Sequence, residues 1–153
     1  MTSAGTFRQV ELIKRGEVDL GLIRVPIEDA RGLAVTVLCK EKMLIAVPSN
    51  HPLASRKSVK IEMLAAEPFI SYPPPEGPSS EGMFVAACQR KGFYPRVVQY
   101  ASQMATKLSF VSSGLGITLV PESMRIVQLP NVVSVSYTHL AQPRRVVAIT
   151  APA

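Results

Sequence analysis

The order of apolar segments constrains the fold most, because strand-like and helix-like patterns follow one another along the whole chain. Short aliphatic and β-branched runs predict strands at 18–24, 33–38, 42–48, 68–72, 96–100, 117–121, 132–137 and 145–150. Helical spacing predicts helices at 7–15, near 61–65, from Ser80 toward Gly92, and at 103–113. This alternation is typical of layered α/β folds, so we predict an α/β protein with mostly parallel sheets. The aliphatic strands at 18–24, 33–38 and 42–48 are predicted to be covered on both faces.

Polar residues mark several predicted helix starts. Thr6 and Gln9 have the spacing of a capping box, so Thr6 is the predicted N-cap of the helix at 7–15. Gly16 would supply the left-handed exit from this helix. In the same way, Ser80 and Ser102 are predicted to cap the helices that follow them.

The stretch Gly114-Leu115-Gly116 looks at first like a phosphate-binding loop. Such a loop follows a strand and opens a helix, so that free amide groups at the helix start meet the phosphate. Here the order is reversed, because Gly114 closes a helix and Gly116 leads into a strand. We therefore predict a helix-to-strand turn rather than a nucleotide site.

The formal charge of +6 invites a nucleic-acid interpretation, but Lys and Arg occur in scattered pairs such as Lys14-Arg15 and Arg144-Arg145. No basic stripe, RNA-binding aromatic motif or zinc-finger spacing appears, so direct nucleic-acid binding by this chain is not expected. The positive charge suits an anionic small ligand, or attraction to DNA held by another domain. No apolar run reaches the roughly 18 residues of a membrane span, and the first residues lack the apolar middle of a secretory signal. We expect a cytoplasmic protein without membrane contact.

Few residues suggest catalysis or metal binding. Cys39 and Cys88 belong to no CxxC motif, and we interpret both as reduced core thiols, with a redox pair as the alternative. His51 and His139 are isolated, and His51 is expected to fix a turn. No Gly-x-Ser-x-Gly elbow or carboxylate pair is present, so we predict neither enzyme activity nor a cofactor.

Five stretches, read in order, resemble the effector-binding domain of LysR-type transcriptional regulators over nearly the whole chain. They are QVELIKRGEVDLGLIR, NHPLA, EPFISY, ACQRKGFYP and FVSSGLGITLVPES. The resemblance implies a two-lobed fold similar to type II periplasmic binding proteins. Lobe I would comprise residues 1–40 plus 142–153, and lobe II residues 41–141, with crossings near 40–42 and 140–143.

The family's DNA-binding winged helix-turn-helix, linker helix, first strand-helix-strand of lobe I and last helix have no counterpart in this sequence. DNA is therefore expected as a partner only through a domain outside this chain. A homo-oligomer is also expected, because exposed strand edges favour pairing with another copy.

In such a fold a ligand sits between the lobes at the carboxyl ends of strands, where helix starts point inward. The resemblance and the predicted helix starts together give eight candidate ligand-binding residues. They are Thr6, Arg24, Ser71, Tyr72, Pro73, Ser102, Gln103 and Met104. Arg24 would pair with an anionic group, and Tyr72 offers a ring face and a hydroxyl. The alternatives are a purely capping Thr6, a surface Arg24, a rigid proline loop and a core Met104.

The sequence thus predicts an effector-sensing domain that binds a small carboxylate and passes a conformational change to a DNA-binding domain. A solute-binding protein of a transport system is the alternative, since it shares the architecture. The effector, the target genes and the sign of regulation are not encoded in any recognisable motif.

Overall fold

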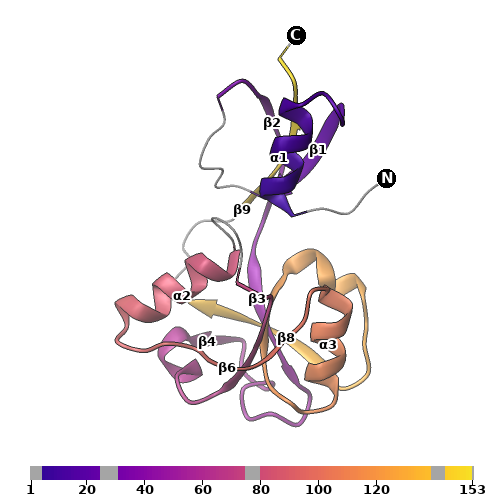
Figure 1. Cartoon of the computed structure of the whole chain (residues 1–153). Helices are drawn as coiled ribbons and strands as arrows, with labels where there is room; N and C mark the ends of the chain where they lie inside the picture. Colours follow the sequence, from indigo (N-terminus) through magenta and orange to yellow (C-terminus); the bar gives the residue numbers. More distant parts are fainter. Residues whose placement is uncertain (1–4, 25–30, 75–79, 139–143, 153) are drawn as a thin grey trace. The chain divides into compact units, whose positions relative to one another are not determined.

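The computed structural model describes residues 5–24, 31–74, 80–138 and 144–152, which form two compact units (Figure 1). Unit 1 holds the described residues of 5–41 and 144–152, and unit 2 holds those of 42–138. The chain passes from unit 1 into unit 2 between Glu41 and Lys42. The second predicted crossing, near 140–143, lies outside the described residues.

Unit 1 is a helix on a small sheet. The helix α1 (Thr6–Lys14) precedes β1 (Leu20–Arg24) and β2 (Ala34–Glu41), and β9 (Arg144–Thr150) lies between these strands in the order β1-β9-β2. Its core consists of four fully buried residues: Ile13, Ile23, Val147 and Ile149. Gly21 allows the close approach of the helix, because a Cβ atom there would lie 2.9 Å from Oε1 of Gln9 and 3.0 Å from Cδ1 of Ile13.

Apolar side chains on the two edge strands of unit 1 remain exposed. Leu20 and Leu22 on β1 are 53% and 55% exposed, and Val35 and Val37 on β2 are 41% and 47% exposed. Val35 and Val37 share a sheet face with the buried Ile149 and Val147, which they oppose in the register, yet they stay uncovered. The prediction that the strands at 18–24 and 33–38 are covered on both faces is therefore wrong for the described residues.

Unit 2 contains two sheets joined at one point. One has the order β4-β8-β3-β7, and the other is the pair β5-β6. The strands are β3 (Met43–Pro48), β4 (Ser58–Lys60), β5 (Pro68–Ser71), β6 (Arg96–Tyr100), β7 (Thr118–Pro121) and β8 (Val132–Thr138). A parallel bridge between Phe69 and Ile117 connects the two sheets.

The helices of unit 2 belong to two separate cores, one on each face of β3. They are α2 (Ser80–Arg90) and α3 (Met104–Ser112), with the short 3-10 helices η1 (Ile61–Leu64) and η2 (Glu122–Ile126). Ile45 and Val47 pack with Phe84 and Cys88 of α2. Leu44 and Ala46 pack with the α3 residues Leu108 and Val111, among others. The strand at 42–48 is thus covered on both faces, as predicted, and α2 and α3 follow the predicted helices within a few residues.

The strand directions correct the prediction of mostly parallel sheets. Among the described pairs, β1-β9, β2-β9, β3-β7 and β3-β8 are antiparallel, and β4-β8 and β5-β6 are parallel. For β2 and β9 the reason lies in the passages between the units. Because β2 takes the chain out of unit 1 and β9 brings it back, these neighbouring strands run in opposite directions.

Two of the predicted caps are also wrong. The N-cap of α1 is Gly5 rather than Thr6, and that of α3 is Gln103 rather than Ser102. Glycine has no side chain, and the Gln103 side chain makes no capping hydrogen bond. α1 begins at Thr6 itself and α3 begins two residues after Ser102, so the signal located each helix but not its N-cap. Gly16 has a positive φ of 71°, in agreement with its predicted role as the helix exit.

The glycine pair after α3 forms the predicted helix-to-strand turn. Gly114 follows the helix with a φ of 82°, in the left-handed region that favours glycine. Gly116 lies against β5, where a Cβ atom would overlap the carbonyl oxygen of Pro68. The same carbonyl accepts the Ile117 amide at 2.8 Å. Both glycines thus serve the junction of β5 and β7, and a phosphate loop is not formed.

Candidate functional site

The parallel pairing of β5 and β6 brings most of the predicted unit 2 residues to one sheet edge. Ser71 at the end of β5 lies opposite Tyr100 at the end of β6. The Ala101 amide donates a hydrogen bond to the Ser71 carbonyl at 2.9 Å. Ser71, Tyr72 and Pro73 therefore lie beside the segment 101–103 that leads into α3. Ser71 is buried, Tyr72 is half-buried, and Pro73, Ser102 and Gln103 are exposed.

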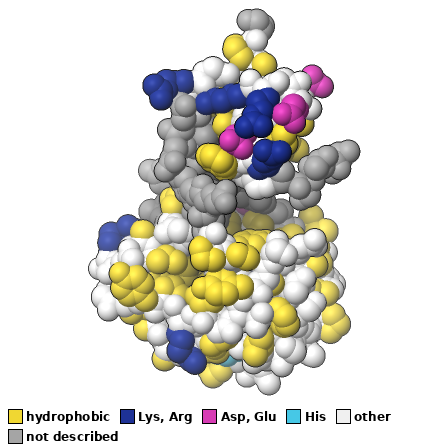
Figure 2. Space-filling model, in the orientation of Figure 1, with side chains coloured by type: hydrophobic (Ala, Val, Ile, Leu, Met, Phe, Trp, Pro, Cys, Tyr) yellow, Lys and Arg dark blue, Asp and Glu magenta, His cyan; other side chains and the backbone are white. Residues whose placement is uncertain are grey.

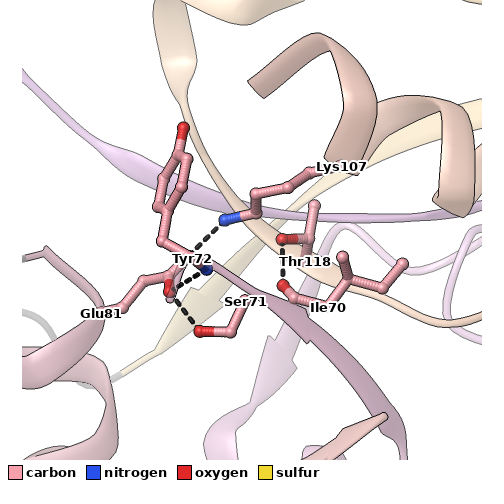
Figure 3. A network of polar contacts seen from close by, with 6 residues as sticks. All are labelled: Ile70, Ser71, Tyr72, Glu81, Lys107 and Thr118. Carbon is pink, nitrogen blue, oxygen red and sulfur yellow. Dashed lines mark hydrogen bonds and ion pairs between the residues drawn. The ribbon is translucent and has the colours of Figure 1, made fainter. Parts of the chain in front are cut away.

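A buried carboxylate ties this edge to both helices of unit 2 (Figure 3). Glu81 in the first turn of α2 accepts hydrogen bonds from the Ser71 hydroxyl, from the Tyr72 amide at 2.8 Å and from the Lys107 ammonium of α3. The Lys107 nitrogen also lies 4.0 Å from the centre of the Tyr72 ring, within the range of a cation–π contact. We call Ser71, Tyr72, Glu81 and Lys107 the carboxylate cluster.

The charges of the carboxylate cluster are almost completely removed from water. Lys107 has no exposed surface, and Glu81 and Ser71 are 7% and 9% exposed. Desolvation lowers the pKa of Lys107, and the charge and hydrogen bond of Glu81 oppose this effect. A buried ion pair is tolerated only when its remaining hydrogen-bonding groups are satisfied. The Ser71 hydroxyl and the Tyr72 amide meet this need for Glu81.

Sequence reasoning missed Glu81 and Lys107, although one of them left a signal. Lys107 lies three residues after Met104 and four before Val111, which places it on the apolar face of α3. A lysine on an apolar helix face either extends its ammonium group to solvent or forms an ion pair with a buried acid. Glu81 occupies the first helical turn, where the helix dipole favours a carboxylate, but nothing in the sequence identifies its partner.

The network continues from β5 into β7. Thr118 is fully buried, and its hydroxyl donates to the Ile70 carbonyl at 2.6 Å (Figure 3). The Ile70 amide in turn donates to the Ile117 carbonyl at 2.8 Å. The end of β5 is therefore fixed from the α2, α3 and β7 sides by hydrogen bonds.

The remaining predicted residues lie elsewhere. Thr6 is the half-buried first residue of α1, and Arg24 is the last residue of β1, so both belong to unit 1. Met104 is partly buried and packs against the core that contains Leu108 and Val111. This contact gives Met104 a structural role in α3.

A cavity of about 330 Å³ opens elsewhere in unit 2. Its lining includes Leu108, Val120, Met124, Arg125, Leu129 and Val132, and none of the predicted site residues. Arg125 is the one charged residue of the lining, and it lies 3.9 Å from the carboxylate of Glu122. This cation is half-exposed and partly neutralised, so the lining offers a carboxylate no buried free cation.

His51 fixes a turn, as predicted. Its Nδ1 accepts the Leu53 amide at 3.2 Å, so Nε2 carries the proton and donates to Glu67 at 3.0 Å. His139 lies outside the described residues. In the part of the chain that the structure describes, no three His, Cys, Asp or Glu side chains gather in a way that could hold a metal ion.

The cysteines differ from each other. Cys88 is buried in α2, in agreement with the prediction, and burial raises its pKa to about 11. Cys39 is exposed on β2, so its prediction as a core thiol is wrong. Both are free cysteines, and they belong to different units.

The face that Figure 2 shows carries charged side chains of both signs. Figure 2 shows Lys and Arg side chains of unit 1 interspersed with Asp and Glu, and apolar side chains gathered on the visible face of unit 2. On α1, for instance, Arg8 lies 3.5 Å from Glu11. Among the described residues, no helix has the length and apolarity needed to cross a membrane.

Comparison with known proteins identifies the class to which this two-unit α/β chain belongs. The family model of the LysR substrate binding domain matches residues 1–153. The chain is 35% identical over 120 residues to the HTH-type transcriptional regulator CatR of Pseudomonas putida, and 31% identical over 147 residues to BenM of Acinetobacter baylyi. These alignments cover 78% and 95% of this chain, but 41% and 47% of the relatives.

The structural comparison agrees with this assignment. The BenM effector binding domain, solved with its effector benzoate, superposes with a TM-score of 0.82 at 24% identity, covering 99% of this chain and 69% of that one. The chain therefore belongs to the LysR substrate binding domain family. It spans less than half of the length of CatR or BenM.

Proposed function

We propose that this chain is the effector-sensing part of a LysR-type transcriptional regulator, and that it binds a small organic acid. The observation that supports this most is the convergence of Ser71–Pro73 and Ser102–Gln103 at the carboxyl edge of β5-β6. In sheets of this kind, ligands bind beyond the carboxyl ends of the strands. The chain presents this edge in a family whose members include BenM, solved with benzoate.

Candidate residues for the proposed binding are found in each unit. Thr6 and Arg24 of unit 1 supply a hydroxyl and a guanidinium for the carboxylate, because Arg forms strong charge-assisted hydrogen bonds with such groups. Ser102 and Gln103 supply the exposed polar groups of unit 2, and Tyr72 its ring. Arg24 is thus the residue that selects an anion.

The proposed output is a shift between arrangements of the two units. A ligand shifts such an equilibrium by no more than its differential affinity for the two states, commonly about 1–3 kcal/mol for coupled sites. In the intact regulator this shift would act on DNA through the DNA-binding domain. We place the regulator in the cytoplasm, where DNA is accessible, and assign no catalytic role to the chain.

Self-association is part of the proposal. The edge strands β1 and β2 of unit 1 carry exposed Leu20, Leu22, Val35 and Val37, and such edges pair readily with further strands. A homo-oligomer would cover part of this apolar surface. The family assignment favours this regulatory function over a transport solute-binding protein.

A thermal-shift screen tests the proposal. Purified chain is heated with sodium benzoate and other small organic acids, each paired with its uncharged amide as a control for shape. A ligand that binds only the folded state raises the unfolding midpoint in proportion to the logarithm of its concentration. We expect at least one acid, and not its amide, to do so. Equal responses to acid and amide throughout the panel would refute the carboxylate preference.

A further inference from the structure

The carboxylate cluster has the composition of an anion-binding site. A hydroxyl from Ser71, a backbone amide from Tyr72 and an ammonium from Lys107 all donate to one carboxylate. These are three kinds of donor by which proteins bind the carboxylate of a ligand. The carboxylate they hold belongs to Glu81 of the chain itself (Figure 3).

We propose that Glu81 is a resident carboxylate that occupies an anion site at the end of β5, and that it thereby determines effector specificity. Lys107 has no exposed surface, so its charge is not available to a ligand while Glu81 remains bound. Its ion pair with Glu81 leaves the cluster without net charge. The end of β5 therefore offers the effector no free charge.

This inference rests on the proposed function in one respect, which is that the end of β5 belongs to the effector site. It narrows the effector to a monocarboxylate with an uncharged opposite end. A second carboxylate directed at the end of β5 would meet the Ser71, Tyr72 and Lys107 donors, which are already satisfied by Glu81. A dicarboxylate of similar size should therefore bind less tightly than the corresponding monocarboxylate.

Chemical rescue tests the resident-carboxylate site without any knowledge of the effector. In Glu81→Ala, removal of the side-chain carboxylate leaves Ser71, Tyr72 and Lys107 around a space into which acetate or formate fits. The unfolding midpoint is measured in sodium acetate and in sodium chloride of equal ionic strength. We expect acetate to increase the folding constant of Glu81→Ala by about tenfold when its concentration is ten times its Kd.

Two matched proteins show whether the rescue arises at this site. The wild type already holds its own carboxylate, and Glu81→Ala/Lys107→Met lacks the cation, so neither should respond to acetate beyond chloride. A Glu81 that serves only to fill space predicts no difference between the two salts in any of the proteins. A folded Glu81→Ala that responds equally to acetate and chloride would overturn the proposal.

A second measurement covers the case in which Glu81→Ala does not fold. If Glu81→Ala is unfolded in chloride, we expect acetate to restore its near-ultraviolet circular dichroism. Failure of acetate to restore it, while Glu81→Asp folds in chloride, would also overturn the proposal. Rescue in a chain whose wild type binds no organic acid would leave the resident-carboxylate site standing and refute the effector function alone.

Discussion

Replacement of Lys107 by methionine should be among the most destabilising single changes in unit 2. The methionine side chain would keep most of the apolar volume, but the Glu81 carboxylate would lose its cation while it stays 7% exposed. Breaking a buried ion pair costs about 3–5 kcal/mol. The Ser71 hydroxyl and Tyr72 amide still donate to Glu81, so we expect the lower end, about 3 kcal/mol.

The partner variant and the double variant complete a thermodynamic cycle. Glu81→Gln leaves the fully buried Lys107 without an anion, so we expect the upper end of the range, about 5 kcal/mol. The double variant should cost less than the sum of the single variants by about 2–3 kcal/mol, because neither charge is then left alone. Urea unfolding followed by circular dichroism gives the three free energies.

A surface pair provides the control. Lys91 lies 2.8 Å from Glu62, and the two side chains are 35% and 43% exposed. Lys91→Met should cost less than about 1 kcal/mol, as is usual for exposed ion pairs. The reasoning fails if Lys107→Met costs no more than this control, or if the Glu81 and Lys107 effects are additive.

Two further predictions concern pH and the glycine junction, and a third concerns the thiols. Desolvation keeps the pKa of Lys107 below its unfolded value, so the unfolded chain binds more protons between these pKa values and stability rises with pH there. Glu81→Gln lowers this pKa further. The loss of stability of this variant relative to the wild type, measured from the urea midpoints, should therefore be smaller at about pH 9.5 than at pH 7. Gly116→Ala should cost about 1–3 kcal/mol, because a Cβ atom there would overlap the backbone carbonyl of Pro68. A thiol reagent should label Cys39 and spare Cys88 in the folded chain, as mass spectrometry of the digested protein would show.

The sequence located most elements because their signals are local. The strand at 96–100 and the glycine turn after α3 are determined by neighbouring residues, and the structure agrees with both. The short strand β4 (Ser58–Lys60) was missed, since three residues give too little pattern. The sheet directions were wrong because they depend on how the chain passes between units, which no local pattern records.

The candidate site likewise contains residues that local sequence signals predicted and residues that they did not. Ser71 and Ser102 were predicted from strand and helix ends, and the pairing of β5 with β6 brings these ends together. The Glu81–Lys107 ion pair joins residues 26 apart in sequence, so only the packing of α2 and α3 reveals it. Lys107 was visible as a charge on an apolar helix face, but its partner was not.

The central proposal is that this chain binds an organic acid, with Arg24 and Ser102 among its ligand contacts. Calorimetric titration with sodium benzoate, or with the acid that gives the largest thermal shift, tests it directly. Arg24→Ala should weaken binding about 10- to 100-fold, and Ser102→Ala about fivefold, as expected for charged and neutral hydrogen bonds. Unchanged affinity in both variants would contradict the account.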